Sequence, residues 1–243
     1  MAKRDKKPTE TEASADEPKS RTGLYIAGVV VAAAVIGGIF YLRDGGAPDP
    51  NASKVDPDVA ALMEAGPLED IVMGSADAPN TIVEYASMTC PHCAHFYNDV
   101  FPQVKEKYID TGKARFVFRE FPLDGLALAA SMLARCAGND RFYPMVDGLF
   151  ETQETWAVPG EDGKQKLLLI AKQAGFTEEA FDKCLADKEL FEKIVEVRKK
   201  AHEEYGVDAT PSFFVNGKRL TGVGIENFET AIDGAPADTP PSG

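Results

Sequence analysis

The tetrapeptide Cys-Pro-His-Cys at positions 90–93 stands where a strand pattern changes into a helix pattern. Residues 81–87 are rich in β-branched and aromatic side chains, which predicts a short strand. Residues 91–108 have a helical pattern that begins with proline, and Pro102 is expected to kink this helix. Residues 114–121 predict a second strand. This strand–helix–strand order constrains the fold most, because it requires two parallel strands joined by a crossover.

The rest of the chain extends this unit into an α/β fold with a helical insertion. Residues from about 125 to 205 are helical in pattern almost throughout. Residues 211–217 predict another strand, the Asn216-Gly217 pair predicts a tight hairpin turn, and residues 218–223 predict the returning strand. A helix over 225–234 closes the folded part.

The N-terminal region predicts a membrane anchor. Residues 24–42 are 19 uncharged residues, and a helix of that length nearly crosses a hydrocarbon layer of about 30 Å. Several lysines and arginines lie in the polar stretch 1–23, so we expect this tail to be cytoplasmic and disordered. The apolar run is long for a cleaved signal peptide, and we favour a retained anchor over that alternative. A linker with a short helix is expected over 43–67, and a flexible tail over 235–243.

The charge balance excludes one class of partner. The chain has a formal net charge of -13 at pH 7, and no basic cluster follows residue 42. Proteins that bind nucleic acid usually carry a basic patch or stripe, so we expect no nucleic-acid partner.

The cysteine pair at the start of the helix allows three interpretations: a redox centre, part of a metal site, or a buried pair without chemistry. The helix N-terminus supplies unpaired N–H groups and a partial positive charge, and both stabilise a thiolate. His92 adds positive charge when it is protonated. Two thiols with one histidine specify a metal poorly, because structural zinc requires four ligands. The redox interpretation is therefore favoured.

These motifs together resemble the DsbA family of bacterial thiol-disulfide oxidoreductases, which have a thioredoxin-like fold with an inserted helical domain. The resemblance rests on CPHC after VEYASMT, on ATPSFFVNG about 120 residues later, and on the helical insertion between them. It covers roughly residues 68–234 and implies that Cys90 is an exposed nucleophile and that Cys93 is a buried resolving thiol. No cofactor is implied.

The resemblance also assigns roles to residues away from the tetrapeptide. Thr210-Pro211 corresponds to a cis-proline loop that packs against the disulfide and pairs with substrate. Glu84 corresponds to a carboxylate that shuttles the proton of the buried thiol, and we expect it near the end of its strand, partly buried, with a raised pKa. Thr210 is typical of reductase and isomerase relatives, whereas Pro91-His92 is typical of oxidases.

Two further cysteines, Cys136 and Cys184, lie in the helical insertion. Four cysteines allow three pairings, and two buried free thiols are the alternative to a bond between these two. Disulfides persist in an exported domain, so we expect a structural Cys136–Cys184 disulfide, which some members of the family also carry.

The expected function is that of a periplasmic oxidoreductase, held in the inner membrane by residues 24–42, which introduces disulfides into exported proteins. Its partners would be reduced or unfolded exported proteins and a membrane reoxidase of the DsbB type. The alternatives are an isomerase or reductase of the same fold, and a copper- or zinc-binding module that uses Cys90, Cys93 and a histidine.

Overall fold

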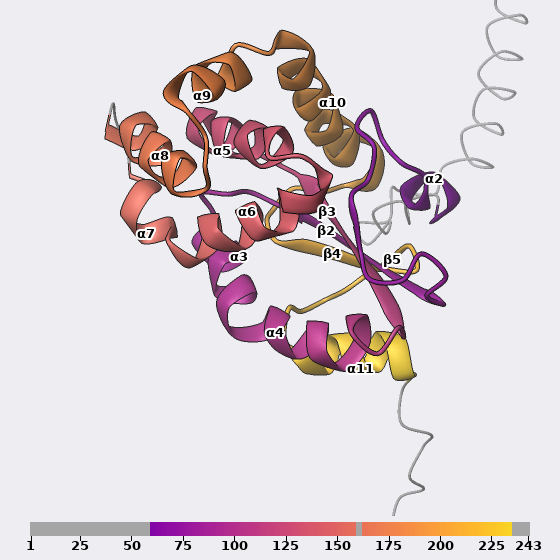
Figure 1. Cartoon of the computed structure of the whole chain (residues 1–243). Coiled ribbons are helices and arrows are strands. Elements are labelled where there is room, and N and C mark those ends of the chain that lie inside the picture. Colours follow the sequence, from indigo (N-terminus) through magenta and orange to yellow (C-terminus); the bar gives the residue numbers. More distant parts are fainter. Residues whose placement is uncertain (1–58, 159–161, 235–243) are drawn as a thin grey trace, which may run out of the picture. The chain divides into compact units, whose positions relative to one another are not determined.

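The computed structural model describes residues 59–158 and 162–234, which form a five-stranded sheet covered by helices (Figure 1). The strand order is β1-β3-β2-β4-β5. Strands β2 and β3 are parallel, and every other neighbouring pair is antiparallel. The strands are β1 (Val72–Met73), β2 (Asn80–Ala86), β3 (Ala114–Glu120), β4 (Ser212–Val215) and β5 (Lys218–Arg219). The predicted α/β framework is therefore confirmed, with β1 as an additional short edge strand.

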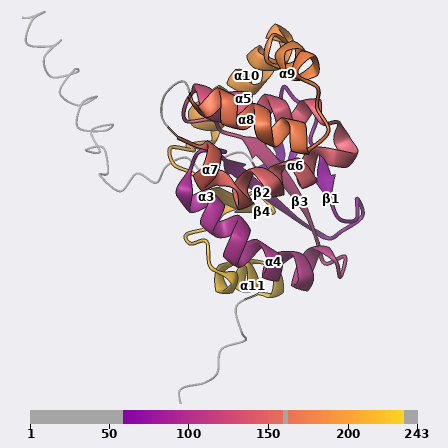
Figure 2. The same ribbon diagram turned by 60° about the vertical axis from the view of Figure 1, so that its left-hand side comes forward.

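Helices account for most of the remaining described residues. One helical run follows β2, and it consists of α3 (Pro91–His95), η1 (Phe96–Val100), α4 (Phe101–Val104) and η2 (Lys105–Ile109). The inserted helices are α5 (Gly125–Cys136), α6 (Asn139–Glu151), α7 (Gln153–Trp156), α8 (Asp162–Gln173), α9 (Glu178–Leu185) and α10 (Lys188–Tyr205). Two others flank the domain, α2 (Val59–Met63) and α11 (Ile225–Asp233). In Figures 1 and 2, α5, α8, α9 and α10 gather towards the top of the domain, and α4 and α11 lie at the bottom.

The two faces of the sheet bury different side chains, because neighbouring residues of a strand point to opposite faces. Ile82, Phe116 and Phe213 face the larger core, which includes residues of α3, α4, α6 and α11. Val83 and Tyr85 face a smaller core with residues of α2 and α10. Glu84, one position before Tyr85, therefore lies on the same face as the larger core.

The helix after β2 is not a regular α-helix. The turns η1 and η2 are π-helical, and the backbone N–H of Phe101 bonds to the carbonyl of Phe96, five residues earlier. Pro102 has no N–H to donate to the previous turn, and an inserted π-turn is one way in which a helix accommodates that loss. The irregularity expected at Pro102 is present as this π-turn.

Local signals in the sequence fix several boundaries. Thr177 caps α9 by accepting a hydrogen bond from the Ala180 N–H at 3.1 Å. Asn216 and Gly217 both have positive φ, 50° and 80°, as a two-residue hairpin turn requires. The returning strand is shorter than predicted, since only Lys218 and Arg219 pair with β4, and the chain leaves the sheet before residue 223.

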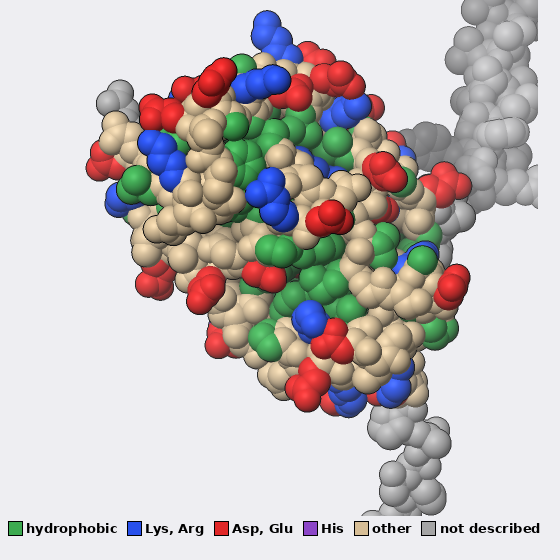
Figure 3. Space-filling view, in the orientation of Figure 1, with side chains coloured by type: hydrophobic (Ala, Val, Ile, Leu, Met, Phe, Trp, Pro, Cys, Tyr) green, Lys and Arg blue, Asp and Glu red, His purple; other side chains and the backbone are tan. Residues whose placement is uncertain are grey.

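The predicted membrane-spanning segment 24–42 lies outside the described residues, as do the tails 1–23 and 235–243 and most of the linker. In the part of the chain that the structure describes, no helix is long and apolar enough to cross a bilayer. Figure 3 shows charged side chains of both signs interspersed over one face, with hydrophobic side chains gathered near its middle.

Candidate active site

Cys90 is the N-cap residue of α3, and three residues separate it from the end of the parallel strand β2 at Ala86. Its carbonyl accepts hydrogen bonds from the N–H groups of Cys93 and Ala94, at 3.1 and 3.2 Å, and so starts the helix. Its Sγ lies 3.3 Å from the carbonyl oxygen of Thr210. Only 5% of Cys90 is exposed, so the expectation of an exposed nucleophile is wrong for this structure.

The pKa of the Cys90 thiol is lowered from 9.0 to about 5. The largest cause is a hydrogen bond from the Cys93 thiol, and burial acts in the opposite direction. The Thr210 side chain and the backbone N–H groups of Cys93 and His92 lower it further. His92 therefore acts on the sulfur through its backbone N–H at the helix N-terminus. Both Pro91 and His92 are exposed.

Cys93 and Glu84 form the buried side of the site. Cys93 has no exposed surface, and burial raises the pKa of its thiol strongly. Glu84 lies in β2, directly opposite Phe118 on one side and Phe213 on the other. It too has no exposed surface, and its two carboxylate oxygens have no hydrogen-bond partner. Burial, followed by the nearby Cys90 charge, raises the pKa of Glu84 well above its usual range.

The predicted direction of the Glu84 pKa agrees with the structure, and its predicted partial burial is wrong. Glu84 is two residues from the end of β2, under the helical run that starts at Cys90. A carboxyl group without partners in that apolar setting is held in its neutral form.

The Thr210–Pro211 peptide bond is cis, and it brings the Thr210 backbone beside Cys90. Thr210 and Pro211 are half-buried. The Thr210 Oγ1 is buried without a hydrogen-bond partner. When Cys90 ionises, this hydroxyl is available to donate to the thiolate, in line with its lowering effect on the Cys90 pKa.

Two contacts from the helical insertion hold the cysteine loop, and no motif in the sequence predicted either of them. The buried Gln153 amide donates hydrogen bonds from Nε2 to the carbonyls of Met88 and Cys90, at 2.9 and 3.0 Å. Asp124, the N-cap of α5, accepts a hydrogen bond from the Thr89 hydroxyl at 2.7 Å. The insertion therefore positions the residues directly before and at the nucleophile.

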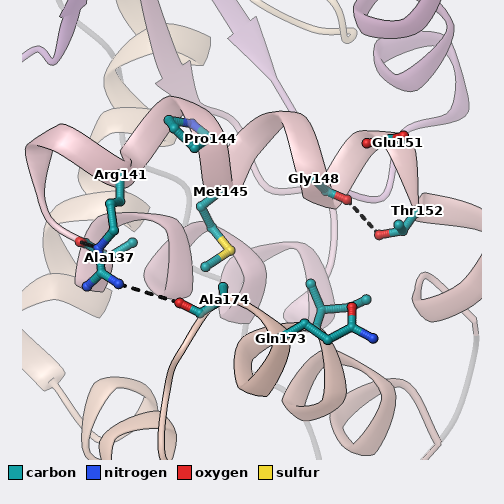
Figure 4. A pocket seen from close by; sticks show the side chains of 10 residues that line it. Ala137, Arg141, Pro144, Met145, Gly148, Glu151, Thr152, Gln173 and Ala174 are labelled. Carbon is teal, nitrogen blue, oxygen red and sulfur yellow. Dashed lines mark hydrogen bonds between the residues drawn. The ribbon is translucent and has the colours of Figure 1, made fainter.

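A hollow of about 560 Å³ lies between α3 and the α6–α7 region, beside the tetrapeptide. It is lined by Thr89, Pro91, Ala94, His95, Asn98, Asp99, Phe150, Glu151, Thr152, Gln153, Glu154, Thr155 and Ala157. A second hollow, of about 420 Å³, lies between α6 and α8 (Figure 4). It shares Glu151 and Thr152 with the first, and Arg141 in its wall donates to the carbonyls of Ala137 and Ala174. No cysteine lines either of these two hollows.

Cys136, at the end of α5, and Cys184, in α9, form a disulfide with an S–S distance of 2.16 Å. Cys90 and Cys93 are the free thiols among the described residues. The tetrapeptide is therefore described in its reduced state.

The metal-site alternative has no support in the geometry. Within residues 59–158 and 162–234, no group of three or more His, Cys, Asp or Glu side chains is placed to hold a metal ion. His95 is exposed, and its Nδ1 lies 2.5 Å from the Asp99 carboxylate.

Comparison with known proteins agrees with this geometry. A family model described as Thioredoxin matches residues 68–234. A Rickettsia bellii protein named "Putative protein-disulfide oxidoreductase" is 38% identical over 167 residues, which cover 68% of this chain and 64% of that protein. Disulfide bond formation protein D of Bacillus subtilis is 32% identical over 155 residues, which cover 60% of this chain and 68% of that protein.

The fold is also similar to solved structures. The crystal structure of alpha-DsbA1 from Wolbachia pipientis has a TM-score of 0.63 and 35% identity, and the match covers 68% of this chain and 89% of that one. The chain spans less than two thirds of the length of the Rickettsia bellii relative. The chain belongs to the thioredoxin family, within its DsbA-like group of thiol-disulfide oxidoreductases.

Proposed function

We propose that the chain oxidises thiols of exported proteins to disulfides through the Cys90–Cys93 pair. The observation that carries this proposal is the placement of the Cys90 sulfur at the N-cap of α3, beside Thr210 and the fully buried Cys93, which lowers the Cys90 pKa to about 5. A stabilised Cys90 thiolate favours the reduced form of the pair, and therefore makes its disulfide a strong acceptor of electrons.

The reaction begins when a substrate thiolate attacks Cys90 Sγ of the oxidised protein. A mixed disulfide forms, and Cys93 leaves with the electron pair of the broken bond. A second substrate thiolate then attacks the mixed disulfide at the substrate sulfur. The substrate disulfide is released, and Cys90 leaves as the thiolate that the site stabilises.

The cellular setting is part of the same proposal. Residues 24–42 would anchor the chain in the inner membrane, with the catalytic domain in the periplasm and a DsbB-type membrane protein as its reoxidant. The length of the apolar run and the basic residues before it support this arrangement. Protease treatment of spheroplasts that express the full chain should degrade the catalytic domain. In a separate experiment, alkaline extraction of untreated membranes should leave the full chain in the membrane fraction. Release of the chain into the alkaline extract would contradict the anchor.

Two measurements test the oxidant role. The oxidised protein, mixed in equal amounts with a reduced peptide that contains two cysteines, should convert most of the peptide to its disulfide. In cells, rapid acid quenching and alkylation should find Cys90 and Cys93 mainly oxidised.

Thr210 favours a second candidate, a reductase or isomerase of the same fold, because the resemblance associates threonine before the cis-proline with those activities. That candidate predicts free thiols at Cys90 and Cys93 in the same alkylation experiment. Little oxidation of the peptide at equal concentrations would also contradict the oxidant role.

A further inference from the structure

Unpaired buried polar atoms gather around the redox pair. Among residues 59–158 and 162–234, the buried side-chain atoms without a hydrogen-bond partner are both carboxylate oxygens of Glu84, the Tyr97 hydroxyl and the Thr210 hydroxyl. Leaving such a group unpaired costs free energy, so each one calls for an explanation. Thr210 lies beside Cys90, and Glu84 lies beneath the pair, but no role has yet been assigned to Tyr97.

Tyr97 and Glu84 share Phe118 as a neighbour, and the charge of Glu84 acts on Tyr97. Tyr97 follows Cys93 by four residues, about one helical turn, and both are buried. The Tyr97 ring stacks on Phe150 with a centroid distance of 4.4 Å and meets the ring of Phe118 edge-on at 6.3 Å. Phe118 is the direct neighbour of Glu84 across the β2–β3 pair. The phenol and the carboxyl group therefore share one apolar compartment under the start of the helix.

The charges in this compartment influence one another. Burial raises the pKa of Tyr97, and Glu84 is the largest of the charges that raise it further. Cys90 in turn raises the pKa of Glu84. The titratable groups that act on Tyr97 and Glu84 come from β2, from the cysteine loop with α3, and from α6; they are Glu84, Cys90, Cys93, Tyr143 and Asp147.

The proposed reaction creates a charge in this compartment. When a substrate thiolate bonds to Cys90 Sγ, the Cys90–Cys93 bond breaks and its electron pair stays on Cys93 Sγ. Cys93 is buried and its thiol pKa is high, so this sulfur takes up a proton. The neutral Glu84 carboxyl group can supply that proton and then remains as a buried carboxylate. In the reverse direction the carboxylate takes the proton back when Cys93 attacks a disulfide at Cys90.

We propose that the Tyr97 hydroxyl donates a hydrogen bond to the Glu84 carboxylate whenever that carboxylate is formed. Tyr97 is then a positioning residue, which acts through Glu84 on the proton of Cys93. The inference rests on the proposed thiol-disulfide exchange. It gives a partner to a buried hydroxyl that has none in the resting protein, and to a buried carboxylate that would otherwise be unpaired.

The test measures how fast Cys93 resolves a mixed disulfide. Glutathione is attached to Cys90 of the full chain, and its release by Cys93 is followed against pH in single-turnover experiments. The rate should rise as Glu84 ionises. In Y97F the Glu84 carboxylate loses a charge-assisted hydrogen bond, which raises the pKa of Glu84. The midpoint of the rate–pH curve should therefore rise by about one pH unit, and glutathione release should be about tenfold slower at pH values below that midpoint.

Tyr143 provides a matched control from the same core. Its hydroxyl donates towards the carbonyls of Ile71 and Phe116, at 2.6 and 3.0 Å, and accepts from the Phe118 N–H at 3.3 Å. Y143F should lower the urea midpoint of unfolding and shift the pH profile of release by clearly less than Y97F. Y97F should show the opposite pattern, because the hydroxyl that it removes has no partner in the resting protein.

A further variant separates the possible outcomes. E84Q should remove the pH dependence, and adding Y97F to E84Q should cause no further slowing. The inference is overturned if Y97F keeps the wild-type profile, if Y143F shifts the profile as far as Y97F, or if Y97F still slows release in the E84Q background. Failure of the wild-type protein to oxidise the dithiol peptide would instead overturn the proposed function.

Discussion

The pH dependence of the redox potential follows directly from the two thiol pKa values. In the reduced pair, Cys90 is ionised above about pH 5 and Cys93 keeps its proton. Reduction of the disulfide therefore takes up two electrons and one proton between about pH 5 and 8. A two-electron couple changes by about 30 mV for each tenfold change in its equilibrium constant. The potential should consequently fall by about 30 mV per pH unit in this range.

The absolute shift at neutral pH has the same origin. A thiol with the reference pKa of 9.0 is almost entirely protonated at pH 7, whereas one of about 5 is ionised. At pH 7 this ionisation stabilises the reduced form by the equivalent of about two pKa units, or about 2.7 kcal/mol. For a two-electron couple that free energy raises the reduction potential of the disulfide by about 60 mV. The sign is fixed, because stabilising the reduced form raises the potential. Below pH 5 this gain disappears, since the folded thiol is then protonated.

The assay equilibrates the folded protein with glutathione buffers from pH 5 to 8 and counts free thiols by mass after acid quenching and alkylation. Because glutathione has its own pH dependence, its potential is calculated at each pH. E84Q serves as a control, since it removes the nearby group whose ionisation is coupled to Cys90. A slope of about 60 mV per pH unit throughout would mean that both thiols bind protons, and the reasoning would be refuted.

Three variants test other parts of the structure. T210V removes the hydroxyl beside Cys90 and should raise the Cys90 thiol pKa, as measured by the pH dependence of alkylation; an unchanged value would show that this hydroxyl does not reach the thiolate. Q153M removes two buried hydrogen bonds and should lower the free energy of unfolding in urea by about 1–3 kcal/mol. An unchanged free energy of unfolding would show that Gln153 does not stabilise the cysteine loop. Replacing Cys136 and Cys184 together by alanine opens a loop with a sequence separation of 48 and should cost about 4 kcal/mol in the same urea assay. Peptide oxidation should persist in that double variant, and its loss would give the second disulfide a role in the chemistry.

The parts of the fold that the sequence predicted best are those specified by local pattern. The abundance of β-branched and aromatic residues located β2 and β3, and Asn216-Gly217 located the hairpin, because each acts over a few neighbouring residues. The edge strand β1 escaped prediction, since two residues carry no periodicity. The returning strand was predicted too long, because the length of a paired strand depends on its partner, and β4 spans only Ser212–Val215.

The properties of the site that the sequence predicted are those that depend on the tetrapeptide and its helix. The helix N-terminus predicted a stabilised thiolate at Cys90, and the lowered pKa agrees. Gln153 lies 63 residues along the chain from Cys90, so only the packing of the insertion brings its amide to the loop. The depth of Glu84 also depends on tertiary structure, because α3, Phe118 and Phe213 together exclude water from a residue that strand position alone would leave half-covered.

A spectroscopic titration of Cys90 tests the central claim most directly. Thiolates absorb in the ultraviolet and thiols do not, so the difference between reduced and oxidised protein reports ionisation of the pair alone. We expect a midpoint near pH 5, with a single thiolate formed and no second transition below pH 8. A single midpoint near 9.0, the value of an ordinary thiol, would contradict the account.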